Sequence, residues 1–149
     1  MDQTDFSLSF TVDADAHQMF RAINDVRGWW AGEIEGRTDA LGAEFTYLQR
    51  GIHRSTQRVT ELVPGQRVVW RVTDASLEFV PQKTEWDGTD IVFELSPKGG
   101  QTEVRFTHRG LVPRFQCYQA CARGWAFYLN DGLRPLIAAG QATPARRAP

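Results

Sequence analysis

Three histidines are the side chains in this sequence best suited to proton transfer or metal binding: His17, His53 and His108. Their spacing matches no metal-binding motif such as His-Glu-x-x-His. His108 shares one side of a predicted strand with Val104 and Phe106, which turns its ring toward the interior. Three interpretations of His108 follow. It is a buried ring satisfied by hydrogen bonds, a polar anchor in an apolar cavity, or a general acid or base.

Two cysteines, Cys117 and Cys121, lie one helical turn apart and close to His108 in the sequence. Two thiolates and an imidazole could bind zinc, but no fourth ligand is visible. A cysteine paired with a histidine is also the arrangement of a nucleophilic site. Small buried cysteines are the common case, and no phosphate loop or serine elbow accompanies these two. We therefore predict no catalytic residue, no metal and no cofactor.

Tryptophan is abundant, with five in 149 residues. A buried indole N–H needs an acceptor, and five indoles are hard to bury in one small domain. We expect some of them to line a pocket or to cover its mouth. They are Trp29, Trp30, Trp70, Trp86 and Trp125.

A long amphipathic helix is predicted from Pro113 to Gly140, and it positions many of these side chains. Pro113 suits its start and Gly140 its C-terminal cap. At about 100° per residue, one face is apolar and the other polar, as in a helix that packs on a sheet. The apolar face contains Tyr118, Cys121, Ala122, Trp125, Tyr128, Leu129, Gly132 and Leu136. The polar face contains Gln116, Gln119, Arg123, Asn130 and Arg134.

Several residues of this helix are unusual. Gly124 and Gly132 lie inside it although each costs about 1 kcal/mol relative to alanine. Glycines on or near a packing face indicate a very close approach or a space left open. Pro135 removes a backbone donor and predicts a kink in the last turn. Phe127 falls on the polar side, as an isolated exposed side chain or as a contact between two copies in a homodimer.

The segments before the helix read as strands joined by tight turns. Residues 6–12 alternate as a half-buried strand, followed by a short helix to about Asn24 and a single-turn segment. Further strands are expected over 33–36, 44–48, 52–62, 67–73, 90–95 and 103–108, with Leu77 and Phe79 extending the fourth of these or starting a loop. Because short loops join antiparallel neighbours, we predict an α+β fold. It has a curved antiparallel sheet of about six to seven strands, two short helices after the first strand and a long C-terminal helix on the concave face.

Composition excludes several classes of function. The net charge is −1, so no basic excess favours nucleic acid, and no basic amphipathic stretch favours a membrane surface. No apolar run approaches the about 18 residues of a membrane span, and the N-terminus lacks a signal-peptide core. We predict one domain over 1–140, a disordered tail over 141–149 and a cytoplasmic location.

Seven stretches carry a family resemblance through their order. They are Gly28-Trp29-Trp30, Gly42-Ala43-Glu44-Phe45, Val59 to Pro64, Arg67-Val68-Val69-Trp70, Phe93-Glu94-Leu95, Glu103 to Leu111, and Gly124-Trp125 through Leu133 to Gly140. In this order the chain resembles the START-like, or SRPBCC, superfamily with its helix-grip fold. Within it, the sequence is similar to the branch named for activator of the heat-shock-protein-90 ATPase.

The resemblance implies a deep cavity between the sheet and the last helix, often holding an apolar small molecule. We expect this chain to bind a small hydrophobic or amphipathic molecule there, without membrane or nucleic-acid partners. The residues expected to line the pocket are Trp29, Trp30, Tyr47, His53, Trp70, Phe93, His108, Tyr118, Cys121, Trp125 and Tyr128. This hypothesis requires a hollow beneath Trp125 and not a solid interior.

Two alternatives stay open. One is a cyclase- or hydrolase-like enzyme that uses His108 or a pocket carboxylate as acid or base. The other is a stress-response or chaperone-cofactor interaction module, which would present a binding patch on the outer face of the sheet.

Overall fold

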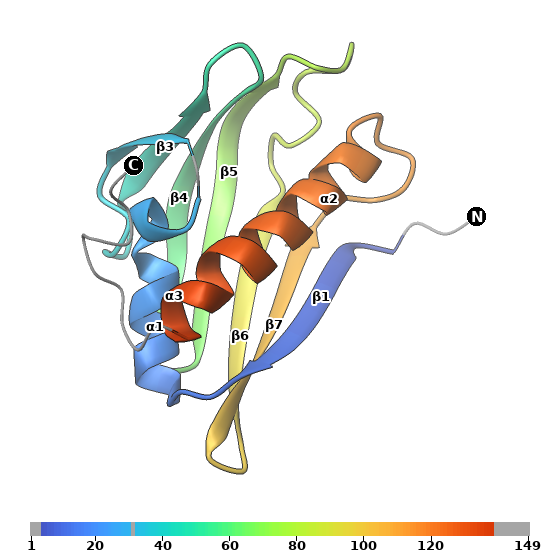
Figure 1. Ribbon diagram of the computed structural model, residues 1–149. Coiled ribbons are helices and arrows are strands. Elements are labelled where there is room, and N and C mark those ends of the chain that lie inside the picture. Colours follow the sequence, from blue (N-terminus) through green and yellow to red (C-terminus); the bar gives the residue numbers. More distant parts are fainter. Residues whose placement is uncertain (1–3, 31, 139–149) are drawn as a thin grey trace.

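One curved antiparallel sheet organises the computed structural model, which describes residues 4–30 and 32–138 (Figure 1). Its strands are β1 (Phe6–Val12), β2 (Glu33–Gly36), β3 (Glu44–Gln49), β4 (His53–Val63), β5 (Arg67–Leu77), β6 (Asp90–Lys98) and β7 (Gln101–Arg109). They pair in the order β1-β7-β6-β5-β4-β3-β2. Every neighbouring pair is antiparallel. Strands β2 to β7 each pair with the next strand in the sequence, whereas β1 pairs with β7 and not with β2.

The helices follow β1 and β7. The first group comprises α1 (Ala16–Asn24) and the single 3₁₀ turn η1 (Val26–Gly28). The second comprises α2 (Tyr118–Phe127), the π-helical segment η2 (Tyr128–Leu133) and α3 (Arg134–Ala138). Figure 1 shows α2 and α3 as one nearly continuous rod that crosses the sheet face, with α1 beside its C-terminal end. This arrangement confirms the predicted α+β fold.

Local sequence explains where α1 begins. Asp15 accepts a hydrogen bond from the backbone N–H of Gln18 at 2.8 Å, and the Gln18 side chain accepts one from the Asp15 N–H at 3.1 Å. This capping box satisfies two donors that the first turn leaves unpaired. Met19 and Ile23 then lie one turn apart and are fully buried. The helix therefore packs through the face that its apolar spacing predicts.

The start of the C-terminal helix differs from the prediction. Helix α2 begins at Tyr118 and not at Pro113, because residues 113–117 form turns. The carboxylate of Glu85 accepts the backbone N–H groups of Gln116 and Cys117 at 2.9 and 3.1 Å. A side chain from the loop after β5 thus caps α2 across the fold. The expected cap at Gly140 and the tail at 141–149 lie outside the described residues.

The irregularity expected from Pro135 lies one turn earlier than its own position. Residues 128–133 form the wider π-helical turn, and Pro135 is the second residue of α3. Proline cannot donate to the carbonyl four residues before it, and a locally widened turn accommodates the missing bond. The rod continues beyond the proline with Leu136 and Ile137 buried.

Two strands run beyond the ranges that alternation defines. Strand β5 ends at Leu77, the extension that the sequence left open, while Phe79 lies in the turn that follows. Strand β6 runs to Lys98, beyond the expected end at residue 95, so the turn is formed by Gly99 and Gly100 alone. Both glycines have positive φ, which non-glycine residues rarely adopt.

The core fills the space between the concave face and the helices. Inward-facing residues of neighbouring strands pair in register, with Trp70 opposite Ile91, Ile91 opposite His108 and Phe93 opposite Phe106. All five side chains are fully buried. In the part of the chain that the structure describes, no helix is long and apolar enough to cross a membrane.

Candidate ligand-binding site

A small cleft lies between the sheet and α2, at the end of the sheet where β3 turns into β4. Its volume is about 40 Å³. It is lined by Trp30, Tyr47, Gln49, His53, Trp86, Cys121, Gly124, Trp125 and Tyr128. Gln49, Gly124 and Tyr128 are half-buried while the other lining residues are buried, so these three form the mouth.

Aromatic rings make the walls of the cleft. Trp30 stacks on Tyr47 with ring centroids 4.0 Å apart, and Trp86 stacks on Trp125 at 5.8 Å with an interplanar angle of 9°. Trp30 also contacts Trp125 at 5.1 Å. These ring pairs join β3, the loop after β5 and α2 around one space, and such flat walls suit a flat apolar molecule.

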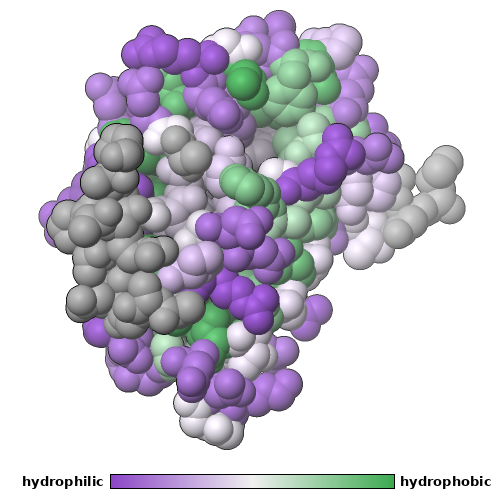
Figure 2. Space-filling view, viewed as in Figure 1, coloured by the Kyte–Doolittle hydropathy of each residue, from purple (hydrophilic) through white to green (hydrophobic). Residues whose placement is uncertain are grey.

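Exposed hydrophobic residues lie near this end of the molecule. Ile52 follows β3 and Phe79 follows β5, and each side chain is more than two-fifths exposed, at 44% and 43%. The backbone N–H of Glu78 donates to the carbonyl of Ile52, so the two loops are neighbours. Figure 2 shows hydrophobic surface gathered at the upper end of the sheet, where these loops lie in Figure 1.

A stripe of buried polar side chains on β4 starts at the cleft and continues into the core. Nε2 of His53 lies 2.8 Å from the hydroxyl of Ser55, and the amide of Gln57 donates to the same hydroxyl at 2.6 Å. All three side chains are buried, and Oε1 of Gln57 has no partner among the described residues. Of this stripe, only His53 lines the cleft.

The cleft is electrically neutral. No Asp, Glu, Lys or Arg is among its lining residues. Burial, with a smaller contribution from the nearby charge of Arg54, lowers the pKa of His53 to about 4. The ring is therefore uncharged at neutral pH. Burial raises the pKa of Tyr47, whose hydroxyl donates to the hydroxyl of Tyr128 at 3.5 Å.

His108 lies behind the cleft and is fully hydrogen-bonded. The indole N–H of Trp125 donates to its Nδ1 at 3.1 Å, so Nδ1 carries no proton. The proton is then on Nε2, which donates to the Thr89 hydroxyl at 2.8 Å, and this hydroxyl donates to the Trp86 carbonyl at 2.6 Å. Burial and the neighbouring His53 lower the pKa of His108 to about 3. Of our three interpretations, the geometry matches a buried ring satisfied by hydrogen bonds.

The structure brings together six of the eleven predicted pocket residues. Those lining the cleft are Trp30, Tyr47, His53, Cys121, Trp125 and Tyr128. Trp29, Trp70, Phe93 and His108 are buried in the core beside it, and half-buried Tyr118 packs its ring edge against Phe6 at 6.5 Å. Periodicity predicts which side chains face the inside of the protein. It does not predict which of them line the same cleft.

Three lining residues are not in the list of expected pocket residues: Gln49, Trp86 and Gly124. Trp86 lies in a loop of turns, where no periodic pattern assigns it to a face. Gly124 was identified as unusual in the helix, and a Cβ at this position would meet only Tyr128, at 3.9 Å. A glycine on or near the packing face indicates either a close approach or a space left open, and Gly124 is the second case.

Among the described residues, the space beneath Trp125 is not the deep hollow that we expected. The cleft's 40 Å³ holds about one water, whereas pockets for small-molecule ligands measure about 300–1,000 Å³. Beneath Trp125 the space is filled by Phe106 at 4.7 Å and by the ring of His108 at 5.9 Å. Large side chains of β6 and β7 thus occupy the volume that the sequence left undetermined.

The cysteines form no metal site within the described ranges, where no group of three His, Cys, Asp or Glu side chains could hold an ion. Both thiols are free and buried. The hydrogen bond to Cys121, together with burial, raises the pKa of the Cys117 thiol. A raised pKa opposes the thiolate that metal binding or nucleophilic attack requires.

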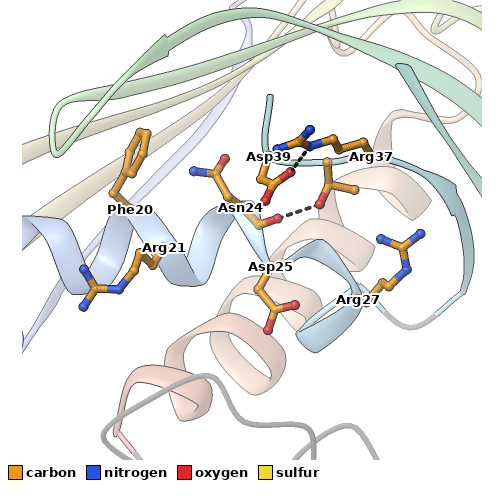
Figure 3. Close-up of a pocket in the computed structure, with 8 residues that line it drawn as sticks. Phe20, Arg21, Asn24, Asp25, Arg27, Arg37 and Asp39 are labelled. Carbon is orange, nitrogen blue, oxygen red and sulfur yellow. Dashed lines mark hydrogen bonds and ion pairs between the residues drawn. The ribbon is translucent and has the colours of Figure 1, made fainter. Parts of the chain in front are cut away.

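A larger hollow of about 520 Å³ lies on the surface beside α1. It is lined by Phe20, Arg21, Asn24, Asp25, Arg27, Arg37, Thr38 and Asp39. Figure 3 shows the guanidinium groups of Arg21 and Arg27 pointing in different directions, while Arg37 is paired with Asp39 at 2.8 Å. Since these cations do not converge on one point, we do not assign an anion site to this groove.

Solved structures with the same fold support the architecture. The solution structure of the Aha1 dimer from Colwellia psychrerythraea has a TM-score of 0.75 and 24% identity, covering 92% of this chain and 98% of that chain. A Rhizobium leguminosarum protein has a TM-score of 0.72 and 15% identity, covering 92% and 95%. For a Mesorhizobium loti protein the values are 0.70, 16%, 91% and 98%. Among curated proteins, none matches this chain.

The curved antiparallel sheet with a C-terminal helix across its face is the helix-grip fold. The sequence profile described as activator of Hsp90 ATPase homolog 1-like protein matches residues 13–138. The chain therefore belongs to this family, as the order of its motifs predicted.

Proposed function

We propose that this protein binds a small hydrophobic or amphipathic molecule in the cleft between the sheet and α2, and that the molecule enters by displacing Tyr128. The observation that carries the proposal is the weak attachment of this side chain. Tyr128 is half-buried at the mouth, and within the described ranges its hydroxyl bonds only that of Tyr47, at 3.5 Å. This distance exceeds the usual range for O–H···O bonds, so outward rotation of the ring gives up a weak hydrogen bond and the packing of a partly buried ring.

The helix around Tyr128 supports such a movement. Gly124 lies one turn earlier and leaves open space beside the Tyr128 ring. Tyr128 is also the first residue of the π-helical segment, and single π turns inside α-helices are frequent at functional sites. A ring at this junction has free space on one side and a widened turn on the other.

Opening is required because the cleft is too small for a ligand at rest. Displacement of Tyr128 would join the interior space to the outside at Gln49 and Gly124, between aromatic walls that provide apolar contact area. The ligand then packs against the cleft-lining rings of Trp30 and Trp125. We therefore expect slow association, since binding follows a conformational change.

The experiment measures binding of 2-acetylnaphthalene by tryptophan fluorescence and by thermal shift. We expect Gly124→Leu to abolish binding, because the new side chain fills the open space. Ala120→Leu, at an exposed position of the same helix, should bind as wild type does. Tyr128→Ala should bind the probe at least several-fold faster than wild type does. Tyr118→Ala, which alters another half-buried tyrosine, at the start of α2, should not. Equal binding by wild type and Gly124→Leu would refute the proposal.

An enzymatic role has weaker support. Both ring nitrogens of His108 are already hydrogen-bonded, and no carboxylate lines the cleft. General acid–base chemistry needs a titratable group within reach of the substrate. Binding therefore remains the better-supported function.

Self-association is a separate proposal. The ring of Phe127 is 59% exposed on α2, on the face opposite to the buried Trp125. We propose that Phe127 contacts a second copy of this chain. Light scattering after size-exclusion chromatography should give a dimer for wild type and a monomer for Phe127→Ser; a monomeric wild type would disprove this contact.

A further inference from the structure

Among the described residues, the indole N–H of Trp86, a residue that lines the cleft, is buried without an acceptor. The N–H of Trp29 donates to the Ile23 carbonyl at 3.1 Å, and that of Trp125 donates to His108. The N–H of Trp86 is buried without a partner among the described residues, and its side chain is only 2% exposed. Buried donors are nearly always paired in native proteins, so this exception requires an explanation.

The surroundings of Trp86 restrict what the missing acceptor can be. The cleft's lining contains no charged side chain, and the ring of His53, whose centroid lies 4.6 Å from that of Trp86, is neutral at pH 7. An anion placed here would lose its hydration with no cation to compensate it. A neutral oxygen loses much less hydration free energy on entering the cleft, and it can still accept a hydrogen bond from the Trp86 N–H.

We propose that the cleft selects an uncharged, flat molecule whose carbonyl, ether or hydroxyl oxygen accepts a hydrogen bond from the Trp86 indole N–H. This inference rests on the proposed function, since it names the chemistry of the ligand in the same cleft. It predicts that neutral aromatic molecules with an oxygen acceptor bind, and that anionic amphiphiles such as fatty acids do not. The hydrogen bond determines selectivity, while stacking on the aromatic walls supplies the apolar contact.

Three probes of nearly equal shape separate the contributions of the hydrogen bond, the charge and the apolar contact to binding. 2-Acetylnaphthalene carries a neutral acceptor, 2-isopropylnaphthalene carries none, and 2-naphthoate carries a charged one. Trp86→Phe keeps an aromatic ring and removes the donor. We expect Trp86→Phe to weaken binding of the ketone by about tenfold, the effect of one buried hydrogen bond. Binding of the hydrocarbon should not change. Trp70→Phe is the matched control, because its N–H is also unpaired but Trp70 does not line the cleft.

A second measurement does not depend on how well a variant folds. Each tryptophan gives one indole signal in a ¹H–¹⁵N spectrum of the wild-type protein. The Trp86 signal should move on addition of the ketone by more than on addition of the hydrocarbon, with slower exchange of its proton. The remaining indole signals serve as internal references.

The outcomes separate the two proposals. A tenfold loss confined to the ketone in Trp86→Phe, with at least tenfold weaker binding of the naphthoate to wild type, supports the inference. Binding of all three probes in proportions that Trp86→Phe does not change overturns it and leaves the proposed function standing. If none of the probes binds to wild type or to Tyr128→Ala, both are wrong.

Discussion

The indole N–H of Trp125 donates to Nδ1 of His108 across 3.1 Å, and this bond sets the proton positions along a buried chain of groups. Because an indole can only donate, His108 must carry its proton on Nε2. Nε2–H then donates a hydrogen bond to the Thr89 hydroxyl, and this hydroxyl donates to the Trp86 carbonyl. The chain therefore connects α2 to β7 and to the loop that lines the cleft.

Trp125→Phe should leave Nδ1 of His108 without a donor and lower the free energy of unfolding by about 2 kcal/mol or more. Urea denaturation measures this loss. Trp70→Phe removes a similar volume from the core but no hydrogen bond, since the N–H of Trp70 has no partner in the described chain. Equal losses in the two variants would contradict the assigned role of the Trp125 bond.

Acidification should destabilise the protein below pH 6.5. His53 and His108 have folded-state pKa values of about 4 and about 3, lowered chiefly by burial from 6.5. The unfolded chain thus binds more protons than the folded one as the pH falls from 6.5 toward these values. The stability is complete above pH 6.5, and each histidine should cost about 2 kcal/mol between pH 7.5 and 5.0.

Urea titrations at the two pH values test this dependence. His108→Gln should reduce the pH-dependent loss by about 2 kcal/mol, whereas His17→Gln, at an exposed position on α1, should leave it unchanged. A loss that is the same in wild type and His108→Gln would show that the ring is protonated in the folded state near neutral pH.

Local periodicity accounts for most of what the sequence predicted correctly. Cys121, Trp125 and Leu129 are buried on one side of the rod, and Arg123 and Asn130 are exposed on the other, as turning about 100° per residue requires. Alternation predicted the strands in the same way. These patterns record which side of an element faces the core, and they need no knowledge of the partner element.

The predictions that were wrong concern features set by residues that are distant in the sequence. The start of α2 is set by Glu85, which lies 31 and 32 positions before the two N–H groups that it accepts. Whether five indoles leave a hollow or fill it depends on the side chains that meet them from β6 and β7, such as Phe93 and Phe106. Inner-face residues could be identified from sequence, but the space left between them could not.

Removal of the Glu85 carboxylate should destabilise the start of α2. Glu85→Ala deprives the N–H groups of Gln116 and Cys117 of their acceptor, a loss of about 1–2 kcal/mol by analogy with helix N-caps. Chemical denaturation gives the stability, and amide hydrogen exchange should be faster at residues 116–118. Glu78→Ala is the control, since its exposed pair with Lys83 should contribute nothing measurable; unchanged exchange in Glu85→Ala would argue against the cap.

The two glycines of the C-terminal rod should respond to alanine with opposite signs. A Cβ on Gly132 would lie 2.6 Å from the carbonyl oxygen of Trp29, so Gly132→Ala must push η2 or the Trp29 backbone away. A Cβ on Gly124 would meet only the edge of the Tyr128 ring at 3.9 Å. Helix propensity alone favours both changes by about 1 kcal/mol, but overpacking typically costs about 1–3 kcal/mol.

We therefore expect Gly124→Ala to raise the free energy of unfolding by up to about 1 kcal/mol and Gly132→Ala to lower it by at least about 1 kcal/mol. Thermal and urea unfolding of both variants against wild type measure the pair. Stabilisation by both would mean that the rod does not approach Trp29 closely. Destabilisation by Gly124→Ala would mean that the space beside Tyr128 is already occupied, and the entry route proposed for the ligand would lose its physical basis.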